Sequence, residues 1–237
     1  MAKVQPNIMP IRGTIGDITY VKRGDKYYAR RKRGTVKKAS INEGFRKSVN
    51  RNAAAIKTAM PINSILADYA GKIREGAFWQ RLLKCIKKCP DDNFDTHLQS
   101  LSGVELNSLH QLSANSLVRP YAITCLPNQI TVTLKFNHHF RFRYERNCYY
   151  YDLIAIRWDK NGEVNDHDCV PTPWIYLNDP PPDLNAVFKR SIFDKYYLFA
   201  LKVTAGLNGG REDGMADMAM AILGGGILDS TPVAGSI

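Results

Sequence analysis

Cysteine is scarce in this chain of 237 residues, and long uncharged apolar stretches are missing. The five cysteines are odd in number and irregularly spaced, which is typical of reduced thiols and not of a disulfide-stapled secreted domain. No segment approaches the run of about 18 apolar residues that a membrane helix needs, and the first residues lack the apolar core of a signal peptide. We therefore expect a protein without a membrane partner, either cytoplasmic or within a phage-like or secretion-related assembly.

The sequence motifs of the common enzyme classes are also missing. There is no phosphate-binding Gly-rich loop, dinucleotide fingerprint, nucleophile elbow or His-Glu-x-x-His zinc helix. The residues considered for a metal site are Cys85, Cys89, His138, His139, His167 and Cys169. Their spacing matches no zinc module, and small buried thiols commonly serve only packing. We expect no enzymatic activity, no metal and no cofactor, with an enzyme of unrecognised site as the least favoured alternative.

Acidic residues are rare in the first quarter of the chain. Residues 1–57 carry fifteen Lys or Arg but only three Asp or Glu, a net charge of +12. The remaining residues carry 18 basic and 19 acidic side chains, a net charge of −1. A charge excess confined to one segment indicates the kind of binding partner and says little about the fold.

A β-hairpin is predicted within this basic segment. Residues 14–22 are rich in β-branched and aromatic side chains, and residues 23–26 have turn chemistry before Tyr27 and Tyr28. Basic side chains that neutralise phosphates are thus combined with rings, including that of Tyr20, that can stack on bases. The predicted nucleic-acid-binding residues are Lys22, Arg23, Lys26, Tyr27, Tyr28, Arg30, Arg31, Lys32, Arg33, Lys37, Lys38, Arg46, Lys47 and Arg51. The alternative is a solvated charge run that only aids solubility.

Helical patterns follow the hairpin. Ser40 and Glu43 fit a capping box, which predicts a helix from about Ile41 to Met60 that ends at Pro61. Its expected apolar face consists of Phe45, Val49, Ile56 and Met60. Two more helices are predicted over residues 64–73 and 77–89, and residues 91–120 are the predicted linker.

Beyond Pro120 the apolar period changes from helical to two. Strong strands are predicted over residues 130–136, 149–158 and 197–204, and weaker ones over 121–125, 172–177, 186–192 and 219–223. About seven short strands favour an antiparallel β-sandwich of immunoglobulin or fibronectin type. The predicted fold class is α+β, with a basic hairpin–helix module (1–60), a helical segment and linker (61–119) and a β-sandwich (120–237).

The apolar, glycine-punctuated segment 219–228 supports two interpretations. It is either an unprotected edge strand that pairs with a neighbouring molecule or the final strand of its own sheet. The first interpretation predicts self-association through this segment.

Short motifs occur in the first half of the chain. They are Gly13-x-x-Gly16 leading to Tyr20, then Tyr28 and Arg30, the basic helix with Arg46, Arg51 and Asn52, and the segment Leu101-x-Gly103-Val104-Glu105-Leu106-Asn107. This pattern resembles a family of uncharacterised proteins from Bacteroidota and their mobile elements. The resemblance implies the same hairpin–helix module and immunoglobulin-like or fibronectin-like sandwich, and it implies no enzymatic activity.

Together these patterns predict a non-enzymatic structural or assembly protein. Its basic module would contact a polyanion, with nucleic acid as the expected class, and its sandwich would make protein contacts in a homo-oligomer or larger assembly. The alternative is a stand-alone protein that binds nucleic acid without sequence specificity.

Overall fold

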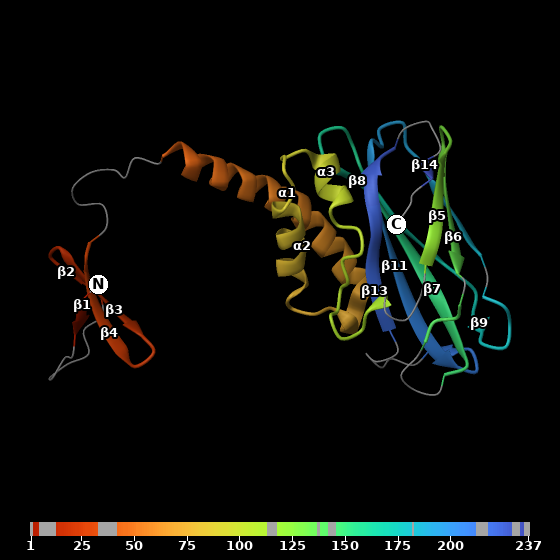
Figure 1. Ribbon diagram of the computed structural model, residues 1–237, viewed down its shortest axis with the longest axis horizontal. Helices are drawn as coiled ribbons and strands as arrows, with labels where there is room; N and C mark the ends of the chain where they lie inside the picture. Colours follow the sequence, from red (N-terminus) through yellow and green to blue (C-terminus); the bar gives the residue numbers. More distant parts are fainter. Residues whose placement is uncertain are drawn as a thin grey trace. The chain divides into compact units, whose positions relative to one another are not determined.

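Helices and antiparallel sheets make up the fold, which is of mixed α+β class (Figure 1). The structure is a computed structural model that describes residues 2–4, 13–32, 42–112, 118–136, 138–141, 146–181, 183–211, 218–228 and 233–234. The chain divides into two compact units, residues 1–48 and residues 49–237. We call the first the N-terminal unit and the second the body. The predicted boundaries at residues 60 and 119 do not coincide with this division.

The N-terminal unit holds a four-stranded antiparallel sheet in the order β1-β4-β3-β2. Its strands are β1 (Ala2–Val4), β2 (Gly13–Ile15), β3 (Ile18–Arg23) and β4 (Lys26–Arg31). The predicted hairpin is confirmed, with its turn at Gly24. The single strand predicted over residues 14–22 is wrong, because Gly16 has a φ of 57° and turns the chain between β2 and β3.

The helices are α1 (Glu43–Ala70), the 3-10 helix η1 (Gly71–Ile73), α2 (Phe78–Lys87) and α3 (Phe94–Gln99). The side chain of Asn42 caps α1, since its Oδ1 accepts a hydrogen bond from the Phe45 backbone N–H at 2.7 Å. Ser40 lies outside the described residues. The predicted end of the helix at Pro61 is also wrong, because α1 continues through this proline.

A face of small and aliphatic residues explains why α1 continues. Its buried residues are Ala55, Thr58, Ala59, Ile62, Leu66 and Ala70, and all but Thr58 belong to one core cluster with the sheet. This packing offsets the cost of a proline inside a helix, about 3 kcal/mol. The predicted apolar face points instead to solvent, since Phe45 and Met60 are 57% and 61% exposed.

Two antiparallel sheets form the rest of the body. The first has the order β10-β6-β5-β14 and consists of β5 (Val118–Cys125), β6 (Gln129–Phe136), β10 (Leu184–Lys189) and β14 (Val233–Ala234). The second is six-stranded and consists of β7 (Cys148–Trp158), β8 (Val164–Pro171), β9 (Ile175–Tyr176), β11 (Tyr196–Leu207), β12 (Gly210–Arg211) and β13 (Met218–Ile227). Each of the seven predicted strands overlaps one of these, whereas β8 and the two-residue strands β12 and β14 were not predicted.

The six-stranded sheet is buried on both faces. Tyr151 of β7 and Leu201 of β11 face the core shared with the four-stranded sheet, whereas Ile154 and Leu198 face the core shared with the helices. Figure 1 shows the helices on one side of β11 and β13, and β5 and β6 on the other. The body therefore has three layers.

The outer edge of β13 is covered by the segment that follows α3. The backbone N–H of Gly103 donates to the Ile222 carbonyl at 2.8 Å, and that of Leu106 donates to the Met220 carbonyl at 2.9 Å. Residues 98–112 of the predicted linker thus contribute side chains to the body's core. The expectation of an unprotected edge at β13 is wrong, and the strand belongs to its own sheet.

Candidate polyanion interface

The sheet of the N-terminal unit has no buried side chain among residues 13–32, and residues 42–48 are likewise all exposed. Three or more strands normally need one hydrophobic face, or a helix packed on it, for independent stability. The two faces of this sheet are instead partly or fully open to solvent. The sheet is therefore suited to contact a partner through its side chains.

Strand register distributes the predicted binding residues over both faces of this sheet. Direct cross-strand partners point to the same side. One face combines Tyr20, Lys22, Tyr27 and Arg31, and the other combines Arg23, Lys26, Tyr28 and Arg30. On the first face the Lys22 Nζ lies 5.6 Å from the centroid of the Tyr27 ring, within the range of a cation–π interaction. Each face thus presents both charge and aromatic surface.

The remaining predicted residues are not all brought to this sheet. Lys32 follows β4 directly, whereas Arg33, Lys37 and Lys38 lie outside the described residues. Arg46, Lys47 and Arg51 lie on α1. Lys47 pairs with Glu43 at 2.9 Å, and Arg51 lies 3.8 Å from Asp92. Acidic neighbours thus partly offset the charge of these last two residues.

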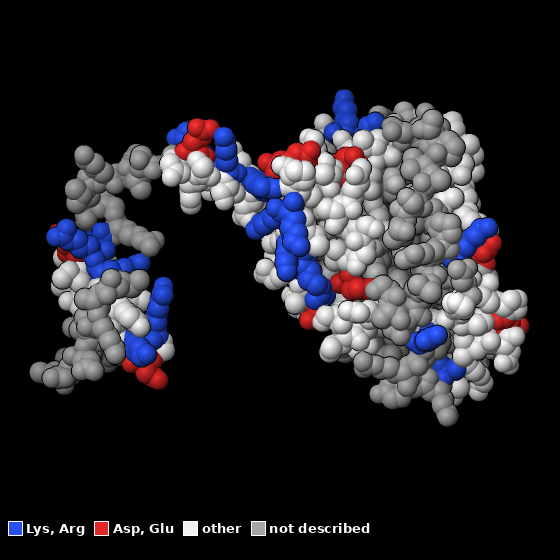
Figure 2. Space-filling view, viewed as in Figure 1, with Lys and Arg blue, Asp and Glu red and all other residues white. Residues whose placement is uncertain are grey.

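A second basic surface lies on the helical layer of the body. Lys84, Lys87 and Lys88 are exposed, and the last two follow Lys84 by three and four positions at the end of α2. Lys72 and Arg74 are exposed in the chain before α2. Figure 2 shows basic side chains as a band across this layer. We call these five residues the α2 basic surface.

Sequence reasoning missed the α2 basic surface, although a signal was present. Residues 72–88 contain six Lys or Arg and only one acid, Glu75. That carboxylate accepts hydrogen bonds from the Ser108 backbone N–H at 3.0 Å, the Arg81 guanidinium at 2.7 Å and the Ser108 hydroxyl at 3.0 Å, and these bonds lower the pKa of Glu75. The net charge of the whole body averages close to zero, which concealed this local excess.

Arg157 of β7 forms the most buried ion network of the body. Its Nη2 donates to Asp166 at 2.7 Å and to Asp168 at 2.8 Å, and its Nε lies 3.4 Å from Asp194. The side chains of Arg157 and Asp194 are each only 1% exposed. The network joins β7, β8 and the turn before β11 by placing three carboxylates around one buried guanidinium, whose Nε and Nη1 make no hydrogen bond among the described residues.

Comparison of the chain with protein-family models, curated proteins and solved structures found no match. The resemblance to proteins from Bacteroidota therefore stays a prediction. Within the part of the chain that the structure describes, no helix is both long and apolar enough to cross a membrane.

The histidines and cysteines considered for metal binding lie at separate places. The Cys89 thiol donates to the Thr96 carbonyl at 3.6 Å, His139 Nδ1 lies 2.9 Å from the Tyr149 hydroxyl, and His167 Nδ1 lies 3.0 Å from the Tyr69 hydroxyl. Burial, and then the nearby Asp152, raise the pKa of Cys169 to about 11, so this thiol is protonated and weakly nucleophilic at neutral pH. Among the described residues, no group of three His, Cys, Asp or Glu side chains is placed to hold a metal ion.

Proposed function

We propose that the protein is a non-enzymatic structural or assembly protein whose N-terminal unit contacts a polyanion, with nucleic acid as the class that fits best. One observation carries the proposal: the sheet has no buried side chain among residues 13–32, and both of its faces present basic residues together with tyrosines. Release of counterions from phosphates supplies affinity for such a surface, and base stacking on the rings adds to it. Neither contact depends on sequence.

The body supports the assembly part of the proposal. Its two facing antiparallel sheets are consistent with an immunoglobulin-like or fibronectin-like sandwich, to which the helical layer is an addition. Ile192 and Phe193, in the turn between β10 and β11, are 86% and 68% exposed. Adjacent exposed apolar side chains of this kind favour contact with another protein subunit. We propose that they contribute to a homo-oligomer or larger assembly.

Salt dependence of binding tests the polyanion contact. Binding to a labelled single-stranded oligonucleotide is measured by fluorescence anisotropy between about 50 and 200 mM salt, where about six phosphate contacts would weaken affinity roughly 300-fold. Replacing Arg23, Lys26 and Arg30 with Gln should reduce the slope of log K against log salt by about two units for a single strand. The matched control replaces the exposed Lys135, Lys160 and Lys189 of the body with Gln. Equal slopes for the two triple variants would refute the proposed contact.

A size measurement separates the assembly protein from the stand-alone binder. Sedimentation at low salt should show a mass that increases between low and high micromolar protein. Replacing Ile192 and Phe193 with Ser should abolish this increase. A strictly monomeric wild-type protein that still binds the oligonucleotide would favour the stand-alone binder.

A further inference from the structure

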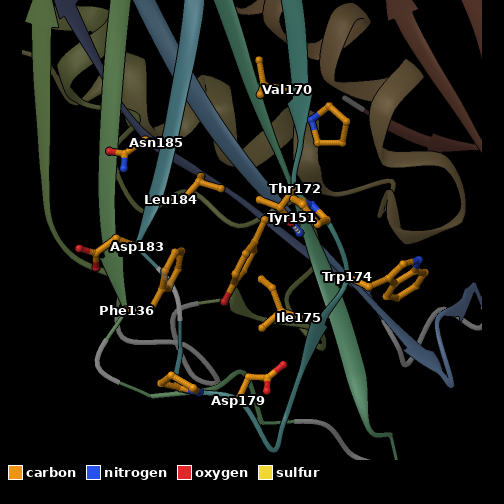
Figure 3. A pocket seen from close by; sticks show the side chains of 13 residues that line it. Phe136, Tyr151, Val170, Thr172, Trp174, Ile175, Asp179, Asp183, Leu184 and Asn185 are labelled. Atoms are coloured by element: carbon orange, nitrogen blue, oxygen red, sulfur yellow. Dashed lines mark hydrogen bonds between the residues drawn. The ribbon is translucent and has the colours of Figure 1, made fainter.

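An open cavity of about 470 Å³ lies in the body between β10 and the chain that runs from β8 through β9. Figure 3 shows it with Phe136 and Tyr151 side by side and with Asp179 and Asp183 near its edge. Its volume falls in the range of sites for small molecules or single side chains. This cavity does not include any residue of the proposed polyanion interface.

The wall of the cavity is apolar and aromatic. The rings of Phe136 and Tyr151 are stacked, with centroids 4.5 Å apart and planes 8° from parallel. Val170, Ile175 and Leu184 add aliphatic surface. The ring of Trp174 turns away from Tyr151 (Figure 3) and packs against Tyr150 instead. Phe136 and Tyr151 are only 5% and 0% exposed, so their rings back the wall, while the more exposed Val170, Pro171 and Pro173 offer apolar surface to a ligand with an apolar stem.

The charge on the cavity has one sign. Asp179 and Asp183 are the only charged residues among the 13 that line it, and both are exposed. Neither pairs with a basic side chain in the described part of the chain. Thr172 Oγ1 accepts a hydrogen bond from the Tyr151 backbone N–H, and Asn185 Oδ1 accepts one from the Thr133 hydroxyl. The two carboxylates thus lack a counter-charge.

We propose that this cavity binds the side chain of an arginine carried by a peptide segment of a partner protein. The methylene stem would lie on the apolar wall, and the guanidinium would contact one or both carboxylates at its edge. An anionic ligand would be repelled by Asp179 and Asp183. A neutral apolar ligand would leave both carboxylates without a cationic partner. A ligand that carries a cation on an apolar stem would contact both the apolar wall and the carboxylates.

Methyl NMR of the full chain tests the proposal. The probe is an acetylated and amidated pentapeptide with arginine between alanines, and the matched peptide carries neutral citrulline in its place. We expect the arginine peptide to shift the Ile175 methyl resonance in a saturable manner. The methyl resonances of Ile156, which lies on the opposite face of β7, should not shift. The citrulline peptide should bind at least about tenfold more weakly, because hydrogen bonds between charged groups are the stronger ones.

Two variants test whether the two carboxylates are responsible for binding the arginine peptide. Asp179→Asn combined with Asp183→Asn should reduce the affinity for the arginine peptide by about tenfold or more. Asp68→Asn, at an exposed position on α1, should bind like the wild type. Equal binding of the two peptides to the wild-type protein would overturn the proposal, as would undiminished binding by the double variant or a lack of any shift at Ile175. The peptide comparison uses wild-type protein, so it holds even if a variant folds poorly.

Discussion

The backbone N–H of Gly103 donates to the carbonyl oxygen of Ile222 across 2.8 Å, and this contact ties the segment after α3 to the edge of β13. The Ile222 N–H in turn donates to the Val104 carbonyl at 3.0 Å. Gly103 reaches this position with a φ of 76°, in the left-handed region that favours glycine. The segment therefore protects the edge of β13 with hydrogen bonds that another molecule would otherwise make.

Gly103→Ala should lower the free energy of unfolding by about 1–2 kcal/mol. An added Cβ would meet no atom within 4 Å, so the cost comes from the backbone conformation alone. Gly76→Ala is the matched control, since that position is equally open and its φ lies outside the left-handed region. Urea unfolding measures both variants. Equal stability of the two would contradict the role assigned to Gly103.

Two neighbouring positions on α1 should respond differently to truncation. Ile62 is fully buried against the sheet, whereas Met60 is 61% exposed. We expect Ile62→Ala to lower the free energy of unfolding by about 2–5 kcal/mol, because it removes buried methyl groups and leaves a cavity. Met60→Ala should change it by less than about 0.5 kcal/mol. Thermal unfolding of both variants checks this, and a larger loss at Met60 would mean that the buried face of α1 is misassigned.

The same helix shows where sequence reasoning failed. Large apolar residues at helical spacing predicted the buried face, but the sheet is contacted by a face rich in alanine. Small side chains let a helix approach a sheet closely, yet they give a weak hydrophobic signal. Pro61 added a second error, because packing of the helix outweighs the local preference of a proline to end it.

Strands were predicted better than helices because alternation along a strand reports burial directly. Ile130, Val132 and Leu134 are buried as predicted, on the face of β6 that contacts the second sheet. Strand β8 was not predicted because its residues are largely polar, including Asp166 and Asp168, which contact Arg157. Pairing with β7, which the sequence of β8 alone does not reveal, holds it in the sheet.

Stability should also depend on the protonation of His97. The ring is buried in the body, with Nδ1 3.2 Å from the Thr58 hydroxyl, and burial lowers the pKa of His97 below its ordinary value of 6.5. Below about pH 6.5 the unfolded chain therefore takes up a proton at this position more readily than the folded protein. The free energy of unfolding therefore has its full value above that pH. It decreases as the pH falls, by at most about 1.4 kcal/mol per pH unit.

Urea unfolding at about pH 7.5 and about pH 5.5 tests the role of His97. His97→Gln should remove part of the loss of stability at the lower pH. His138→Gln, at an exposed position, should leave the loss unchanged. The same pH dependence in the wild type and in His97→Gln would exclude this histidine as its source.

Because the six-stranded sheet is buried on both faces, the helices cannot complete their packing until late in the synthesis of the chain. Helices α1 and α2 leave the ribosome early, but Met218, Met220 and Ile222 of β13 complete the core on which they pack. At about 5–20 residues per second, the apolar faces of these helices wait on the order of ten seconds for that strand. A nascent chain of this protein therefore exposes core surface for most of its synthesis, and a chain terminated before β13 would leave that surface open to chaperones and proteases.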